Sequence, residues 1–254
     1  MSVSGSGRRV AIVTGGTYGI GRAITLALAR EGCAVVAFGI DRRQADGTRA
    51  ALDELGLTGE TLEGDVSVGA DVQRAVEFTI GKYGQIDALC NNAGIRPLGT
   101  ILETDEETWD RAFAVNIKGM YLFTRAVLPH MIARGGGVII NTASTAGYGK
   151  DGRIAYCSSK GAIFPFTRSL AIDHLKDRIR VNAIVPGPTL TGMTENSPPE
   201  RLRAMGAHSV AGRMNTPEEI AHAVAFLVSD KARTITGAIW EVGTSQGGTF
   251  MGIW

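Results

Sequence analysis

The stretch VAIVTGGTYGIG, residues 10–21, decides the fold of this chain. An apolar run typical of a buried strand leads into Gly15, Gly19 and Gly21, and a helical pattern over 19–32 follows at once. Glycine lets backbone N–H groups approach a pyrophosphate, and the amino end of a helix attracts negative charge. This order predicts a dinucleotide-binding motif, with a turn that binds nothing as the alternative.

Further short apolar runs divide the rest of the chain, with helical patterns between them. Most are continuously apolar rather than alternating, as in strands of a parallel sheet that helices bury on both faces. They cover residues 34–39, 61–66, 86–94, 137–144, 181–187 and 238–243. The alternation predicts an α/β fold: a Rossmann-type doubly wound parallel sheet of about seven strands, with helices on both faces.

Three helical segments have recognisable ends. The pattern over 71–84 ends at a glycine, which is common just beyond a helix. Residues 104–107, Thr-Asp-Glu-Glu, have the form of a capping box and predict a long helix that runs to about Arg134. Thr216 followed by Pro217 begins another helix, because proline fits the first helical position.

The chain of 254 residues is predicted to form one domain, 1–254, because no linker rich in Pro, Gly or Ser divides it. Residues 1–8 are expected to form a flexible tail, and they lack the apolar centre of a secretory signal. The polar, turn-rich stretch 188–210 follows the carboxyl end of a strand. Binding sites form there in such sheets, so we predict a substrate-binding loop.

Composition and charge exclude several kinds of partner. A formal net charge of +1, with scattered Lys and Arg, argues against nucleic acid. The apolar runs stay short of the roughly 20 residues of a membrane span, so no membrane association is predicted. Three widely spaced cysteines favour reduced, packed thiols in a cytoplasmic protein. The four histidines lack ligand spacing, so we predict no metal site.

Tyr156 and Lys160 lie four residues apart and would share one face of a helix. Taken alone, such a pair is more often a solvated surface contact. Other motifs accompany it in order along the chain: TGGTYGIG (14–21), Asp65-Val66, NNAG (91–94), Asn116, Ser144 and Pro186-Gly187. From Val10 to about Val242 the whole set resembles the short-chain dehydrogenase/reductase family.

The resemblance implies catalytic roles for four residues. Tyr156 would be the general acid/base and Lys160 its activator. Ser144 would position the substrate oxygen, and Asn116 would hold a water that links Lys160 to solvent. A free phenol has a pKa of about 10, and an ammonium at about 4 Å lowers it by at most about 3, to near 7. We therefore expect an NAD(P)-dependent oxidoreductase that moves a hydride between a nicotinamide cofactor and a secondary alcohol or ketone.

The same resemblance implies the residues that bind NAD or NADP. Pro186, Gly187 and Thr189 would line the nicotinamide, and Asp65 and Val66 the adenine side. Asn91 would lie near the adenosine ribose or would tie neighbouring strands together, and the sequence leaves both open. The full predicted set is Gly15, Thr17, Tyr18, Gly19, Ile20, Gly39, Asp41, Asp65, Val66, Asn92, Ala93, Gly94, Tyr156, Lys160, Pro186, Gly187 and Thr189.

Two positions depart from the family pattern. NAD-preferring members end the second strand with an acidic residue that binds the ribose 2′-hydroxyl, and here that position is Gly39. Asp41 could reach the ribose, whereas Arg42 could meet a 2′-phosphate. Since Asp41 would repel that phosphate, we expect NAD. Near the carboxyl terminus, the usual V-D-G-G is replaced by VGTS (242–245), which loses a carboxylate at position 243.

The substrate is less well defined by the sequence than the reaction. The loop 188–210 contains few aromatic residues, which favours a small polar, sugar-like or cyclic substrate. Arg96, Lys150 and Arg153 are expected near the pocket mouth, where they would bind an anionic group or remain solvated charges. A 3-oxoacyl carrier-protein reductase is an alternative, although such members tend to carry a basic residue where this chain has Ile172.

Two further readings concern the class of protein and its assembly. A dinucleotide-binding regulatory protein without turnover is the alternative from another class, and the retained Tyr156 and Lys160 argue against it. The resemblance also implies a homotetramer, with the helix over 105–134 and the Tyr156-bearing helix at one interface. In such proteins the terminus, here ending in Trp254, often packs against another subunit.

Overall fold

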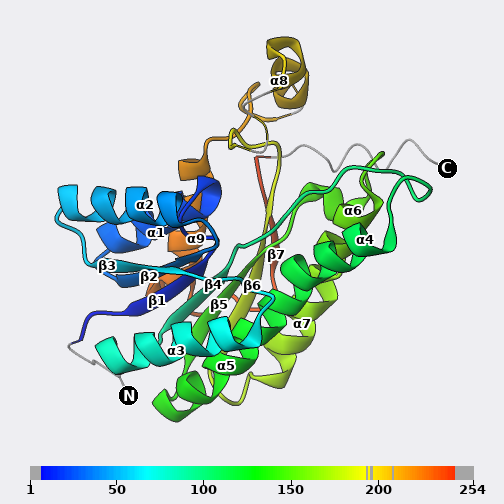
Figure 1. Cartoon of the computed structure of the whole chain (residues 1–254). Coiled ribbons are helices and arrows are strands. Elements are labelled where there is room, and N and C mark those ends of the chain that lie inside the picture. Colours follow the sequence, from blue (N-terminus) through cyan, green and yellow to red (C-terminus); the bar gives the residue numbers. More distant parts are fainter. Residues whose placement is uncertain (1–6, 193, 195–196, 208, 244–254) are drawn as a thin grey trace.

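The computed structural model describes residues 7–192, 194, 197–207 and 209–243, and the predictions for the first six residues and for Trp254 lie outside this part. Seven parallel strands form one sheet in the order β3-β2-β1-β4-β5-β6-β7 (Figure 1). The strands are β1 Val10–Thr14, β2 Ala34–Gly39, β3 Gly59–Glu63, β4 Ala88–Asn91, β5 Gly137–Thr142, β6 Ile179–Pro186 and β7 Ile239–Val242. The predicted doubly wound fold is confirmed.

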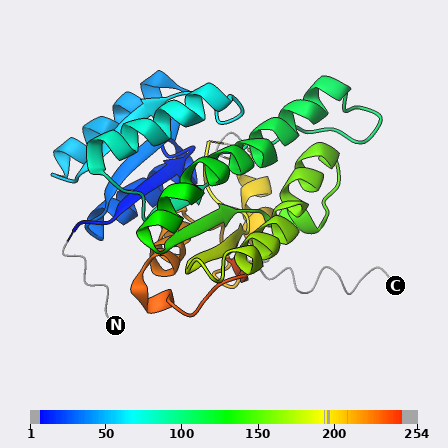
Figure 2. The ribbon, with the colours of Figure 1, turned by 90° about the horizontal axis from the view of Figure 1, so that it is seen from below.

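Helices connect the strands and cover both faces of the sheet (Figure 2). The helices are α1 Gly19–Arg30, α2 Arg42–Glu54, α3 Gly69–Tyr83, α4 Glu106–Phe113, α5 Gly119–Arg134, α6 Ile154–Gly161, α7 Ile163–Asp173, α8 Pro199–Gly206 and α9 Pro217–Val228. One core cluster packs α1 and α9 against the sheet, and a second packs α3 and α5 against its other face. Every residue of β1 and β2 is therefore buried, which explains their continuously apolar sequence.

The strand order reverses between β1 and β4. The chain moves outward from β1 to β2 and β3, and then returns to β4 on the other side of β1. Crossover connections diverge at such a point, so a crevice opens beyond the carboxyl ends of these two strands. The glycine-rich turn after β1 and the NNAG segment after β4 both lie at this edge.

The predicted helix over 105–134 contains a local change in winding. It consists of α4, a π-helical turn at Ala114–Lys118, and α5. Asn116 lies in this π turn, a geometry that is rare and frequent at functional sites. The predicted capping box at Thr104 was wrong: Asp105 is the N-cap and accepts from Thr108 N, whereas Thr104 Oγ1 donates to Thr100 O.

Two other expectations concern the carboxyl-terminal half. The predicted start of α9 at Thr216 and Pro217 is confirmed, and the structure adds a capping box in which the Thr216 and Glu219 side chains each accept from the other residue's backbone N–H. The stretch 188–210, predicted as a loop, contains α8. Within the described residues, no helix combines the length and the apolar character needed to cross a membrane.

Candidate active site

A cavity of about 350 Å³ lies at the carboxyl ends of the strands, over the point where the strand order reverses. Every residue of the predicted cofactor set lines it except Asp41. Of the predicted catalytic residues, Ser144, Tyr156 and Lys160 also line it, and Asn116 lies behind the wall. The structure thus brings together residues from positions 15 to 189 of the chain.

The glycine-rich turn is packed too closely for larger residues. A Cβ at Gly15 would lie 2.9 Å from Ala93 Cα, and a Cβ at Gly21 would collide with Gly15 O. Asn92 holds the two loops together, because its backbone N donates to Thr14 Oγ1 at 3.0 Å and its Nδ2 to Thr14 O at 3.2 Å. The result is a backbone-lined wall at the amino end of α1, which fits a pyrophosphate.

The end of β2 has no room for an acidic side chain. A Cβ at Gly39 would overlap Thr17 Oγ1, so the buried Thr17 side chain occupies that space. Asp41 does not line the cavity but caps α2, its Oδ1 accepting from Gln44 N at 2.9 Å. Ile40 and Gln44 line this part of the cavity instead, and the sequence analysis missed them as site residues.

Asp65, on the β3 side of the cavity, is held by its neighbours. Its Oδ1 accepts from Ser67 N and Oγ at 2.8 and 2.7 Å, and its Oδ2 pairs with Arg111 at 2.8 Å. Burial opposes the charge, yet the hydrogen bonds from Ser67 and Arg111 hold the pKa of the carboxyl below its ordinary value. Asp65 is therefore an ionised part of the wall at neutral pH.

Ser144 and Tyr156 meet at the carboxyl end of β5. Ser144 caps a short 3₁₀ turn, Thr145–Tyr148, and its Oγ accepts from Ala146 N at 3.1 Å. Tyr156 lies in the first turn of α6, and the Ser144 side chain acts on its hydroxyl, favouring the ionised phenol. Two hydroxyl groups from separate elements therefore share one point of the cavity wall.

Lys160 follows Tyr156 on α6 and is almost fully buried. Its Nζ donates to Thr142 O at 2.7 Å, and burial lowers its pKa from 10.5 to about 8. Gly94 completes this corner: a Cβ there would lie 3.3 Å from Lys160 Nζ and 3.1 Å from Asn116 Oδ1. Because Gly94 has no side chain, the Lys160 ammonium and the Asn116 amide have room at this corner of the cavity.

Asn116 fixes the loop after β4 to α6. Its Oδ1 accepts from Ile95 N at 2.8 Å, while its Nδ2 donates to Ile95 O at 3.0 Å and to Ser159 Oγ at 2.9 Å. Ser159 Oγ in turn donates to Tyr156 O at 2.9 Å. The π turn thereby couples the Tyr156-bearing helix to the glycine-containing loop.

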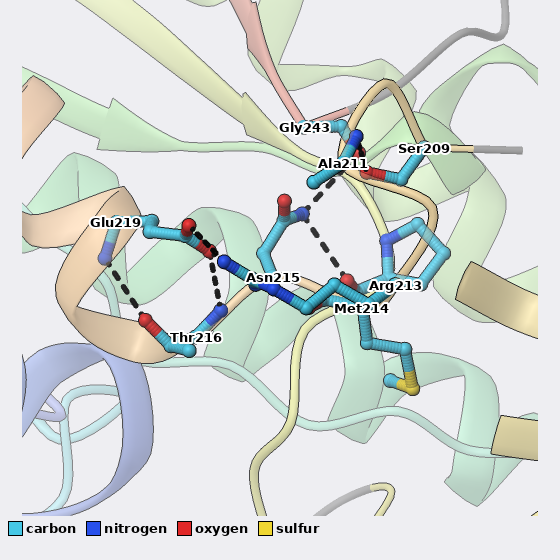
Figure 3. A network of polar contacts seen from close by, with 9 residues as sticks. Ser209, Ala211, Arg213, Met214, Asn215, Thr216, Glu219 and Gly243 are labelled. Atoms are coloured by element: carbon cyan, nitrogen blue, oxygen red, sulfur yellow. Dashed lines mark hydrogen bonds and ion pairs between the residues drawn. The ribbon is translucent and has the colours of Figure 1, made fainter. Parts of the chain in front are cut away.

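The loop after β6 is held by Asn215 (Figure 3). The Asn215 backbone N donates to Pro188 O at 2.8 Å, and its Nδ2 donates to Pro188 O at 3.1 Å and to Gly243 O at 3.3 Å. Thr189 Oγ1 also donates to Gly187 O at 2.9 Å. The loop that carries Pro186, Gly187 and Thr189 is thus anchored to the last strand.

Comparison with known proteins identifies the family. A family model described as enoyl-(acyl carrier protein) reductase matches residues 15–244. The chain belongs to the short-chain dehydrogenase/reductase family. The predicted resemblance is therefore confirmed.

Three members of this family illustrate the similarity. The chain is 39% identical to 2-(S)-hydroxypropyl-CoM dehydrogenase 3 of Xanthobacter autotrophicus, over 92% of this chain and 94% of that protein. It is 35% identical to 3-oxoacyl-[acyl-carrier-protein] reductase of Thermotoga maritima, over 91% and 94%. A crystal structure of an actinorhodin polyketide ketoreductase variant with NADPH has a TM-score of 0.90 and 31% identity, covering 95% of this chain and 98% of the other.

As predicted, this short-chain dehydrogenase/reductase is an NAD(P)-dependent oxidoreductase that acts on CH–OH groups. Its cavity offers what that reaction requires. Backbone groups and the amino end of α1 fit the pyrophosphate, and paired hydroxyls lie where a substrate oxygen can be bound. The bound nicotinamide cofactor donates or accepts the hydride.

The electrostatics around Tyr156 differ from the sequence-based expectation. Burial raises the pKa of the phenol above its ordinary value, and Ser144, Arg96 and Arg153 act against this rise. Lys160 was expected to bring that pKa near 7, but its ammonium is itself desolvated and donates to Thr142 O. In the cofactor-free chain, burial therefore outweighs the charges that favour the phenolate.

Contacts decide between the two roles that the sequence left open for Asn91. Asn91 is buried, and its Nδ2 donates to Thr124 Oγ1 at 3.1 Å and Asn141 Oδ1 at 3.0 Å, so it ties β4 to β5 and α5. Three residues that the sequence did not predict also line the cavity: Arg111, Thr142 and Met205. They carry no motif, and only long-range packing brings them there.

Proposed function

We propose that Tyr156 is the general acid/base of this enzyme. The observation that carries the proposal is that Tyr156, Ser144 and Lys160 line one cavity, with the Ser144 side chain close enough to the Tyr156 hydroxyl to favour the phenolate. In reduction, Tyr156 donates its proton to the developing alkoxide of the substrate, and in oxidation it accepts the alcohol proton. Ser144 donates a hydrogen bond to the same substrate oxygen, where the charge changes most.

Lys160 and Asn116 support this chemistry from behind the wall. With a pKa of about 8, Lys160 exchanges its proton near neutral pH and can return one toward Tyr156 after each turnover. Asn116 positions α6 through its bond to Ser159 and has its amide beside Lys160. The same proposal includes a water held by Asn116, through which Lys160 would exchange its proton with solvent.

We propose NAD rather than NADP as the cofactor. Among the described lining residues near the end of β2, Ile40 and Gln44 offer no positive charge for a 2′-phosphate. Arg42 is directed to carboxylates instead, 3.5 Å from Asp46 and 3.9 Å from Glu63. Gln44 supplies polar groups within reach of a ribose hydroxyl.

The proposed substrate is a small polar, sugar-like or cyclic secondary alcohol or its ketone. The hydroxypropyl-CoM dehydrogenase relative supports a secondary alcohol. The Thermotoga relative supports the alternative of a 3-oxoacyl carrier-protein reductase, whereas Ile172 on α7 is 69% exposed and presents no charge to an acidic carrier. A non-catalytic dinucleotide-binding role would require cofactor binding without turnover.

We further propose one domain that acts as a cytoplasmic homotetramer, with the stretch 188–210 as the substrate-binding loop. Exposed apolar side chains on and after α5 and α7 support subunit contacts: Tyr121, Ile132, Ile172 and Leu175. The three cysteines are free and buried, which suits a reducing compartment. Met205 of α8 lines the cavity, which supports the role of the loop.

The Tyr156→Phe variant tests the catalytic proposal. We expect turnover to fall by about 10²- to 10⁴-fold because the proton donor is lost. Cofactor affinity should change little. Absorbance at 340 nm over a panel of ketones, sugars and an acetoacetyl carrier protein measures the turnover, and calorimetry with NADH measures the affinity. Tyr83→Phe, on α3 and outside the cavity lining, is the matched control, and unchanged turnover in Tyr156→Phe would refute the role.

A further inference from the structure

Two arginines lie on the substrate side of the cavity, beside Tyr156. The loop after β4 and the segment before α6 are joined by Gly99 N, which donates to Gly152 O at 2.9 Å, and by Ile154 N, which donates to Gly99 O at 3.1 Å. This pairing brings Arg96 and Arg153 onto one wall, and both line the cavity together with Lys150. Neither loop alone would form this basic wall.

The positive charges on this wall are close enough to act on one another. Burial lowers the pKa of Arg96, and the charge of Arg153 lowers it further. Both guanidinium groups favour the ionised form of Tyr156, against its burial. Among the described residues that line the cavity, Asp65 is the one with a carboxylate, and Arg111 pairs with it on the β3 side. Among the described lining residues, the Tyr156 side of the cavity therefore presents Arg96, Lys150 and Arg153 and no carboxylate.

Arg153 shows the strongest sign of an absent partner. Its Nε is buried and has no hydrogen-bond partner among the described residues. A buried N–H group without a partner is unfavourable, because it has given up its hydrogen bond to water. An oxyanion bound to Arg153 would supply the missing partner, because the planar guanidinium matches a carboxylate, phosphate or sulfonate with two parallel hydrogen bonds.

We propose that the cavity binds a small hydroxy or oxo substrate that carries an anionic oxyanion group, held by Arg153 and Arg96. The inference deepens the proposed function and rests on Tyr156 acting on the substrate carbonyl. Arg153 is the N-cap of α6, and its charge acts on the Tyr156 phenol, so the two side chains lie on the same side of the cavity. The anionic group is therefore only a few bonds from the reacting carbon.

The first experiment measures anion binding without hydride transfer. Acetate, phosphate and methanesulfonate are titrated into the full-length protein with NAD, with chloride at equal ionic strength as reference, and binding is read by calorimetry. We expect at least one oxyanion to bind the wild type, and its affinity to fall about 10- to 100-fold in Arg153→Gln. Arg30→Gln, at the exposed end of α1, is the matched control.

The second experiment compares paired substrates that differ in charge. The pairs are acetoacetate with 2-pentanone, dihydroxyacetone phosphate with dihydroxyacetone, and 2-oxopropanesulfonate with 2-butanone. The ratio of kcat/KM for the anionic to the neutral partner should exceed one in at least one pair. That ratio should fall about 10- to 100-fold in Arg153→Gln and in Arg96→Gln. The pair with the largest ratio identifies the type of oxyanion.

The two experiments separate this inference from the function on which it rests. Turnover of no substrate would refute the proposed function, while the titration would still decide whether the wall binds an anion. Absence of binding by every oxyanion, or equal affinity in wild type and Arg153→Gln, would overturn the inference. If Arg153→Gln does not fold, Arg96→Gln and Arg153→Lys decide instead, since lysine retains the charge without the two-pronged geometry.

Discussion

At the scale of single residues, Lys160 shows how the fold changes a group's chemistry. Its ammonium is buried beside β5 with Thr142 O as its hydrogen-bond acceptor, and its pKa is lowered from 10.5 to about 8. Between these two values the unfolded chain binds more protons than the folded chain. Below pH 8, the buried Lys160 ammonium therefore lowers the free energy of unfolding of the protein. This loss disappears as the pH rises toward 10.5.

Comparison of wild type with Lys160→Met measures this contribution. Relative to the variant, the wild type should gain up to about 3 kcal/mol in free energy of unfolding between pH 7 and pH 10.5. Urea unfolding at several pH values and one protein concentration provides the measurement. Lys176→Met, at an exposed site, controls for general effects of the substitution. A difference between wild type and Lys160→Met that stays constant with pH would contradict the desolvation of this lysine.

At the scale of elements, one amide joins the last strand to the loop after β6. Gly243 has a φ of +65°, and a Cβ there would overlap Asn215 Oδ1. The carboxylate that family members usually have at this position is thus replaced by the Asn215 side chain, which bonds Gly243 O and Pro188 O. The lost V-D-G-G motif is accommodated by this contact between distant segments.

Restoring the family residue should therefore destabilise this chain. We expect Gly243→Asp to lower the free energy of unfolding by about 1–3 kcal/mol, from steric overlap and loss of hydrogen bonds. Gly32→Asp is the matched control, because Gly32 has a φ of +86° but open space at its Cβ position. Combined with Asn215→Ala, Gly243→Asp should cost less than the sum of the two single changes. Additive effects in urea unfolding would show that the two positions do not compete for space.

At the scale of the whole molecule, the cavity joins both halves of the sheet. Its lining runs from Gly39 and Asp65 on one side of β1 to Ser144 and Thr189 on the other. A dinucleotide that spans it would contact residues that are far apart in the chain. Ligand binding to the folded state alone stabilises that state by mass action.

We therefore expect NAD to raise the melting temperature of the protein. At a concentration of about 100 times Kd, the stabilisation is about 2.7 kcal/mol, or about 5–10 °C for a chain of this size. NADP at the same concentration should raise the melting temperature less, because the described lining residues near the end of β2, Ile40 and Gln44, carry no positive charge for its 2′-phosphate. Differential scanning calorimetry with each cofactor provides the measurement. A larger rise with NADP would refute the proposed cofactor preference.

The local sequence predicted the strands and helices of the fold, but not every N-cap or the π turn. The apolar runs and glycines predicted the seven strands and the dinucleotide-binding turn, because burial on both faces and tight turns leave their pattern in neighbouring residues. The choice of Asp105 over Thr104 as N-cap was missed because both residues can cap, and only the loop at Thr100 takes the Thr104 hydroxyl. The π turn at Asn116 leaves no local signal.

The sequence by itself determined the doubly wound sheet, the family and the spacing of Tyr156 and Lys160, since each is a property of near neighbours in the chain. Only the tertiary structure decided where the Lys160 ammonium donates, which group occupies the space at Gly243, and that Arg96 and Arg153 share a wall. Each of these depends on burial and on contacts between segments far apart in sequence. Desolvation and steric exclusion are set by the surroundings that the folded chain creates, and no short stretch of sequence contains them.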